Sequence, residues 1–139
     1  MPLVDITLAP GVPEQQVGLI GETVQKALVE ALRVPADDHF QIHSAARTLV
    51  YDPAYLGVER SDGFLVIRVF LARGRTVTQK KALYRELAQG LENRCGVRPQ
   101  DVFVTLVEVG KEDFSFGCGL AQYADSHPSH LAPTSAVDE

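Results

Sequence analysis

The feature that most constrains this fold is a match of the sequence to itself. Shifting the 139-residue chain by 63 positions sets Pro2 against Leu65, and no gap is needed to keep the two halves aligned. Eight identities then fall within about forty positions. The identical pairs are Leu8 and Leu71, Ala9 and Ala72, Gly11 and Gly74, Gln16 and Gln79, Leu28 and Leu91, Val34 and Val97, Asp38 and Asp101, and Phe40 and Phe103. A duplicated unit is the economical explanation.

Each half shows the same succession of strand, helix and strand. The first half predicts a strand over residues 2–8, a helix whose apolar residues recur every three or four positions from Val17 to Leu32, and a strand around Phe40 and Ile42. The second half predicts a strand over residues 64–71, a helix over 77–95 and a strand over 102–107. Crossovers between parallel strands are nearly always right-handed, so both helices should cover one face. We therefore predict an α/β (α+β) fold, a duplicated β-α-β unit with a four-stranded sheet.

Length and composition predict one folded domain. Apolar residues make up 45% of the chain and charged residues 22%, as in ordinary globular proteins. We expect a domain over residues 1–123, with repeats at about 2–45 and 64–108, and a mobile tail over 124–139. A net charge of -5 argues against nucleic acid as a partner. No apolar run is long enough for a membrane span or signal peptide, which predicts a cytoplasmic protein without a membrane partner.

The predicted sheet has one face that the helices leave uncovered. Strand residues such as Phe64, Leu65, Val66 and Ile67 show little polar alternation and are typical of strands buried on both faces. We therefore expect the chain to self-associate.

The Met1-Pro2 start is the first candidate for chemistry. Methionine is commonly removed when a small residue follows it, which would leave Pro2 with a free secondary amine. An amino-terminal amine has a pKa near ~8, so it can serve as acid or base around neutral pH. A secondary amine can also condense with a carbonyl. The alternative is that Pro2 only begins an edge strand, where proline is tolerated.

Two arginines, Arg73 and Arg75, flank Gly74 between a predicted strand and a predicted helix. Guanidinium groups offer paired donors to a carboxylate, and a helix N-terminus also favours an anion. The matching turn in the first half contains no arginine, so the fold does not require the pair. The alternative is a solvated pair of turn residues.

Asp38 precedes the second predicted strand and is the third candidate. It could orient a water, accept a proton, or pair with the amine of Pro2. The repeat also supports a purely structural turn, because Asp101 occupies the matching position. His39 and His43, expected on one strand face, and the thiols of Cys95 and Cys118 are not grouped with further ligands, so we predict no metal site.

Together these residues resemble the tautomerase superfamily, and within it the malonate semialdehyde decarboxylase group. The resemblance spans about residues 2–123 and differs from the group's usual pattern at Phe114, where tryptophan is common. It is carried by Pro2 after Met1, the β-α-β duplication, Asp38-His39-Phe40-Gln41, Arg73-Gly74-Arg75 with Gln79-Lys80, and Asp113-Phe114-Ser115-Phe116-Gly117.

The resemblance implies a site and an assembly. In this group the amino-terminal proline is catalytic, an aspartate at the Asp38 position assists it, and arginines at positions 73 and 75 hold the carboxylate of a small substrate. It also implies a homotrimer that uses neither a metal nor an organic cofactor. Phe114 and Phe116 would form an apolar wall of the substrate site, or simply pack a hairpin.

We therefore expect decarboxylation of a small 3-oxo acid such as malonate semialdehyde, with Pro2 polarising the carbonyl or forming an iminium. Two alternatives stay open at the level of sequence. One is a keto-enol tautomerase of 2-oxo acids, acting on phenylpyruvate or 2-hydroxymuconate, with neutral Pro2 as base. The other is a non-catalytic trimer that binds a carboxylate.

Overall fold

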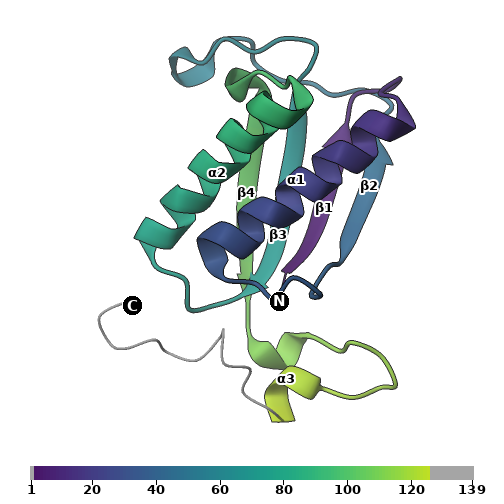
Figure 1. Ribbon diagram of the computed structural model, residues 1–139, viewed down its shortest axis with the longest axis vertical. Helices are drawn as coiled ribbons and strands as arrows, with labels where there is room; N and C mark the ends of the chain where they lie inside the picture. The colour runs from purple at the N-terminus through teal and green to yellow at the C-terminus, as the bar shows by residue number, and fades with distance from the viewer. Residues whose placement is uncertain (1, 126–139) are drawn as a thin grey trace.

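The computed structural model describes residues 2–125 and confirms the duplicated β-α-β architecture (Figure 1). The first unit contains β1 (Pro2–Leu8), α1 (Glu14–Leu32) and β2 (Gln41–Ala45). The second contains β3 (Leu65–Ala72), α2 (Val77–Cys95) and β4 (Val102–Val109). Short elements complete the fold: the 3-10 helices η1 (Tyr55–Gly57), η2 (Pro99–Asp101) and η3 (Lys111–Asp113), and the single-turn helix α3 (Gln122–Asp125).

The repeat extends to the helix boundaries. Both α1 and α2 have 19 residues, and each begins and ends 63 positions from its counterpart. Both end on a left-handed residue, Arg33 with φ 58° and Gly96 with φ 69°. The starts differ, because Thr76 and Gln79 form a reciprocal capping box on α2, whereas Pro13 gives α1 no side-chain cap.

The four strands form one mixed sheet in the order β2-β1-β3-β4. Each outer strand runs parallel to the inner strand of its own unit, and the two inner strands pair antiparallel. The start of β1 therefore lies beside the end of β3, with Pro2 opposite Leu71. This pairing brings the chain's beginning next to the turn that follows β3.

Both long helices lie on the same face of the sheet, as expected (Figure 1). The core between them and the sheet consists of alternate strand residues and the inner faces of the helices. Its fully buried side chains include Val4, Ile6, Ile20, Val24, Leu28, Leu65, Ile67, Leu83, Leu87 and Leu91. Burial of this apolar surface is the main force that stabilises the unit.

The other face of the sheet carries apolar side chains that remain about half exposed. Phe103 is 47% exposed and Ile42 is 48% exposed. A surface ion pair crosses the middle of this face, where Arg68 Nη2 lies 2.8 Å from Asp5 Oδ2. The mixture of apolar side chains and a charge pair is compatible with a protein interface.

Two sequence predictions need adjustment at their edges. His39 was expected on the second strand together with His43, but β2 begins only at Gln41, where its pairing with Val4 starts. The predicted tail over 124–139 falls mainly on residues 126–139, which lie outside the described residues, while Ala124 and Asp125 belong to α3.

No helix within residues 2–125 is long and apolar enough to cross a membrane.

Candidate active site

The antiparallel pairing of β1 with β3 builds the candidate site at one end of the sheet. Pro2 is buried opposite Leu71, two residues before Arg73. The carbonyl of Phe40 accepts a hydrogen bond of 3.0 Å from the Val4 amide, which fixes the segment after Asp38 beside β1. Three separate segments that the sequence had singled out thus meet at this end.

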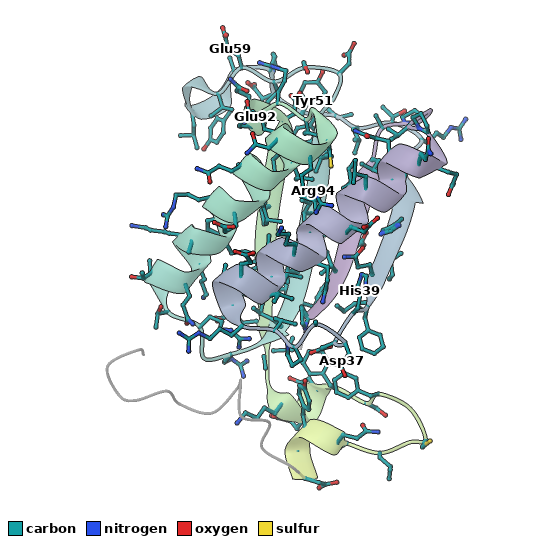
Figure 2. All side chains as sticks on the ribbon, viewed as in Figure 1. Asp37, His39, Tyr51, Glu59, Glu92 and Arg94 are labelled. Carbon is teal, nitrogen blue, oxygen red and sulfur yellow. The ribbon has the colours of Figure 1, made fainter. Side chains whose placement is uncertain are left out.

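Figure 2 shows the same arrangement. Asp37 and His39, the neighbours of Asp38, lie at the end of the sheet that faces α3, while Tyr51 and Glu59 lie at the opposite end. The segment after β4, including α3, hangs below the first of these ends in Figure 1. Candidate residues from β1, the loop before β2, the turn after β3 and the segment after β4 therefore share one region.

The two arginines of the turn after β3 occupy different environments. Arg75 is buried, and Arg73 is exposed. Arg75 Nη2 donates one long hydrogen bond of 3.4 Å to the carbonyl of Leu32, at the C-terminus of α1. Its Nε has no hydrogen-bond partner within the described residues, and no carboxylate among them forms an ion pair with it.

Burial lowers the pKa of the Arg75 guanidinium, and the electrostatic interaction with Tyr123 opposes that shift. Buried cations are normally paired, because removing a charge from water is costly. Because Arg75 has an unused donor and no carboxylate partner among residues 2–125, its guanidinium is suited to bind an anion.

Asp38 is held in the loop between α1 and β2. Its amide donates to the Pro35 carbonyl at 3.0 Å, and its own carbonyl accepts from Gln25 Nε2 at 3.2 Å. Burial raises the pKa of its carboxyl, and the positive charge of the amino terminus opposes this effect. A partly buried carboxyl that interacts with the amino terminus is a candidate proton acceptor or donor.

Aromatic side chains gather beside these polar groups. Phe114 and Phe116 stack with their ring centroids 5.7 Å apart, and Phe40 lies 6.1 Å from Phe116. Phe40 belongs to the loop that carries Asp38, so the contact joins the two segments. The rings of positions 114 and 116 are thus near the candidate site, as an apolar wall requires.

Sequence reasoning missed Tyr123, which it left at the edge of the predicted domain. Burial and the charge of Asp38 together raise the pKa of Tyr123 to about 12, and the charge of Arg75 opposes them. Its hydroxyl therefore lies within the electrostatic reach of both charged groups. The aromatic spacing Phe114, Phe116, Tyr123 was the available signal, but the polar, proline-containing sequence that follows obscured it.

The histidines and the thiols have other neighbours. His39 and His43 line a shallow pocket between the segment of Gln41 and helix α1, and His43 Nε2 lies 2.7 Å from Gln41 Oε1. Within residues 2–125, no three His, Cys, Asp or Glu side chains are grouped to hold a metal ion. Cys95 and Cys118 are free thiols, and Cys95 lies 3.5 Å from the Thr23 hydroxyl.

A cavity of about 690 Å³ lies at the opposite end of the sheet. Its lining includes Leu65, Asp101 and the turn Pro10, Gly11 and Val12, which are the repeat counterparts of Pro2, Asp38 and the arginine turn. Asp101 accepts hydrogen bonds from the amide and the hydroxyl of Ser61, at 2.7 and 2.6 Å. The counterpart of Asp38 is thus fully engaged within the fold.

Comparison with known proteins identifies the family of the chain. A family model described as tautomerase enzyme matches residues 38–117. The probable tautomerase YusQ of Bacillus subtilis (strain 168) is 41% identical over 124 residues, covering 88% of this chain and 98% of that protein. The chain belongs to the tautomerase superfamily.

Solved structures place the chain in the malonate semialdehyde decarboxylase-like group. A malonate semialdehyde decarboxylase, studied for its decarboxylase and hydratase activities, superimposes with a TM-score of 0.83 at 34% identity. The match covers 88% of this chain and 96% of that one. A fused 4-OT, described as a symmetric trimer, shares the fold with a TM-score of 0.71 at 24% identity, over 89% of this chain and 99% of that one. The fold and the resemblance expected from the sequence are thereby confirmed, and the chain is an enzyme of this superfamily.

Proposed function

We propose that this member of the tautomerase superfamily is a cofactor-independent decarboxylase of a small 3-oxo acid of the malonate semialdehyde type. The observation that carries the proposal is the buried guanidinium of Arg75, which lacks a carboxylate partner within residues 2–125 and lies at the same end of the sheet as Pro2. The similarity to a malonate semialdehyde decarboxylase supports it.

In this mechanism Arg75 holds the substrate carboxylate, and the exposed Arg73 contributes a second cation at the entrance. Fixing the carboxylate allows the breaking carbon–carbon bond to lie parallel to the carbonyl π-system. Protonated Pro2, released by removal of Met1, donates a hydrogen bond to the carbonyl oxygen. The carbon–carbon bond to the carboxylate then breaks, carbon dioxide leaves, and the electron pair of that bond forms an enolate whose oxygen accepts the hydrogen bond from Pro2. The enolate takes one proton at carbon to give the aldehyde. An iminium on Pro2 would accept the same electron pair.

Asp38 orients Pro2 or a water and exchanges the proton that returns to carbon. Its carboxyl is suited to that task because burial raises its pKa and so favours the protonated form. Phe114 and Phe116 exclude water from the side of the site near the reacting carbon, where a lower dielectric strengthens the electrostatic contacts.

We also propose that the chain assembles as a homotrimer. The half-exposed side chains of the open sheet face support this, as does the trimeric state given for the fused 4-OT. Burying this face between subunits would remove its apolar groups from water. Light scattering of the purified protein tests the assembly, and a monomer would contradict it.

A second candidate function is keto-enol tautomerisation of a 2-oxo acid. It is favoured by the relative named a probable tautomerase. In this case neutral Pro2 takes a proton from one carbon and returns it to another, while the arginines hold the same carboxylate.

An assay of the Met1-free protein on malonate semialdehyde, beside phenylpyruvate enol, separates the two. Mass spectrometry first establishes that Met1 is absent, and Pro2→Ala serves as the control. Release of carbon dioxide that depends on Pro2 supports the decarboxylase. Conversion of the enol alone supports the tautomerase, and inactivity on both compounds contradicts the two assignments.

A further inference from the structure

Tyr123 occupies a position that the proposed mechanism does not yet use. Its ring lies 4.8 Å from the ring of Phe116, and it contacts Phe114 edge to face at 6.0 Å. Aromatic contacts of this geometry orient a ring as well as bury it. The phenol is therefore packed against the two rings that border the candidate site.

A neighbouring side chain fixes the turn that carries Tyr123. Gln122 Oε1 accepts a hydrogen bond of 3.0 Å from the Phe116 amide, and Gln122 Nε2 donates to the Gly117 carbonyl at 3.1 Å. These two bonds attach α3 to the segment of Phe114 and Phe116. The direction of the Tyr123 side chain is thus set by its packing and by this amide brace.

The charges around the hydroxyl are of opposite sign. The field of Arg75 and the field of Asp38 both act on it. Because the pKa of Tyr123 is raised to about 12, the phenol keeps its proton through the range in which the protein works and remains a donor. An anion between these groups is attracted by Arg75 and repelled by Asp38, so it would settle on the side where Arg75 and the phenol offer donors.

We propose that Tyr123 is a further substrate-recognition residue, whose hydroxyl donates a hydrogen bond to the carboxylate held by Arg75. This inference rests on the proposed function and deepens it. The carboxylate then has one charged and one neutral donor, while the carbonyl end of the substrate points to Pro2. A ligand in which a neutral group replaces the carboxylate loses both donors and should bind poorly.

The decisive variant is Tyr123→Phe, which retains the ring and its packing and removes only the hydroxyl. Binding of 3-hydroxypropanoate, a small carboxylate that cannot decarboxylate, is measured by calorimetry. We expect the Kd to rise about tenfold, the effect of losing one hydrogen bond to a charged group. The matched control is Tyr55→Phe, which removes a hydroxyl from a tyrosine that is 64% exposed in η1. Its Kd should equal that of the wild type.

Kinetics and stability distinguish the recognition role of Tyr123 from a purely structural one. If its hydroxyl binds the carboxylate equally in the ground and transition states, Tyr123→Phe should raise KM and leave kcat and its pH profile unchanged. A lower melting temperature with an unchanged Kd, or loss of a limb of the pH profile, would overturn the recognition role.

The binding readout also separates this inference from the proposed function. If the wild-type protein binds 3-hydroxypropanoate but releases no carbon dioxide from malonate semialdehyde, the decarboxylase proposal fails while the role of Tyr123 is still decided by the Kd ratio. An equal Kd in Tyr123→Phe and the wild type overturns the inference even if the decarboxylase is active. Absence of any binding by the wild type contradicts both.

Discussion

Pro2 and Leu65 occupy matched positions of the repeat at opposite ends of the sheet, and their nitrogens differ in kind. The nitrogen of Leu65 belongs to a peptide bond in the middle of the chain, whereas that of Pro2 is separated from the chain's start only by Met1. The turn that faces Pro2 carries Arg73 and Arg75, and the turn that faces Leu65 carries Pro10 and Val12 instead. In the proposed function, with Met1 removed, the Pro2 end presents an amine and two turn arginines, whereas the matched positions Leu65, Pro10 and Val12 present neither.

The matched aspartates differ in the same way. Asp101 is only 1% exposed, accepts two hydrogen bonds from Ser61, and forms an ion pair with Arg98 at 3.5 Å. Asp38 lies in a loop, and burial raises the pKa of its carboxyl. The two similar frameworks therefore differ: one holds its aspartate in bonds to Ser61 and Arg98, and in the proposed function the other uses its aspartate for chemistry.

The largest expected effect comes from Arg75→Ala. Removing a donor aimed at the reacting group typically lowers turnover by about 10²–10³-fold. The free energy of unfolding should change by less than about 1 kcal/mol, because the one hydrogen bond of Arg75 within residues 2–125 is long and the buried cation is costly to keep. Steady-state kinetics beside urea unfolding measure the two effects, and a loss of folded protein equal to the loss of turnover would contradict the role.

Exchanging each aspartate for asparagine sharpens the comparison of the two ends. Asp38→Asn should lower turnover by about 10²-fold, the usual contribution of an acid or base, with little loss of stability. Asp101→Asn should cost about 2 kcal/mol of unfolding free energy through weakened bonds to Ser61, with normal turnover for each folded molecule. Reversal of the two outcomes would mean that the chemistry lies at the other end.

The pH dependence of stability tests the environment of Asp38 separately. The folded-state pKa of Asp38 is raised above 3.8, so the folded state favours the protonated carboxyl. The resulting contribution of Asp38 to the free energy of unfolding is fully present below pH 3.8 and is lost as pH rises through the folded-state pKa. Asn cannot ionise, so Asp38→Asn should gain stability relative to the wild type as pH rises from 3 to 7. Urea unfolding across this range measures the difference, and a constant difference would contradict the raised pKa.

The smallest expected effect concerns the ends of the two helices. Arg33 adopts the left-handed conformation that Gly96 adopts in the other unit, and only glycine does so without steric cost. Arg33→Gly should therefore stabilise the fold by about 0.5–1 kcal/mol, and the matched variant Gly96→Ala should destabilise it by about 1 kcal/mol. Thermal unfolding measures both variants, and destabilisation by Arg33→Gly would show that its side chain contributes contacts of its own.

The repeat made most of the fold predictable from the sequence. Helix α2 has the bounds that its pattern predicted, and the offset of 63 positions between Pro2 and Leu65 holds for both helices. The start of β2 was harder to predict from the sequence, because the polar residues before Gln41 have no periodicity and only the pairing with Val4 fixes where the strand begins.

The candidate site was predictable where local residue types carry the chemistry, as at Pro2, Asp38 and Arg75. Burial was not predictable, since nothing in Arg73-Gly74-Arg75 states which guanidinium turns inward. The position of Tyr123 depends on contacts with Phe116 and on the brace from Gln122, which only the folded chain brings together.

The central claim is that the Pro2 end of the sheet, and not its repeat counterpart, binds a small carboxylate. Gly74 and Gly11 are matched probes, because they occupy equivalent turns at the two ends. An NMR titration of amide signals with 3-hydroxypropanoate reports on both in one experiment. The account predicts a saturable shift at Gly74 with Gly11 unchanged. A saturable shift at Gly11 with Gly74 unchanged, or no shift at either glycine, would contradict it.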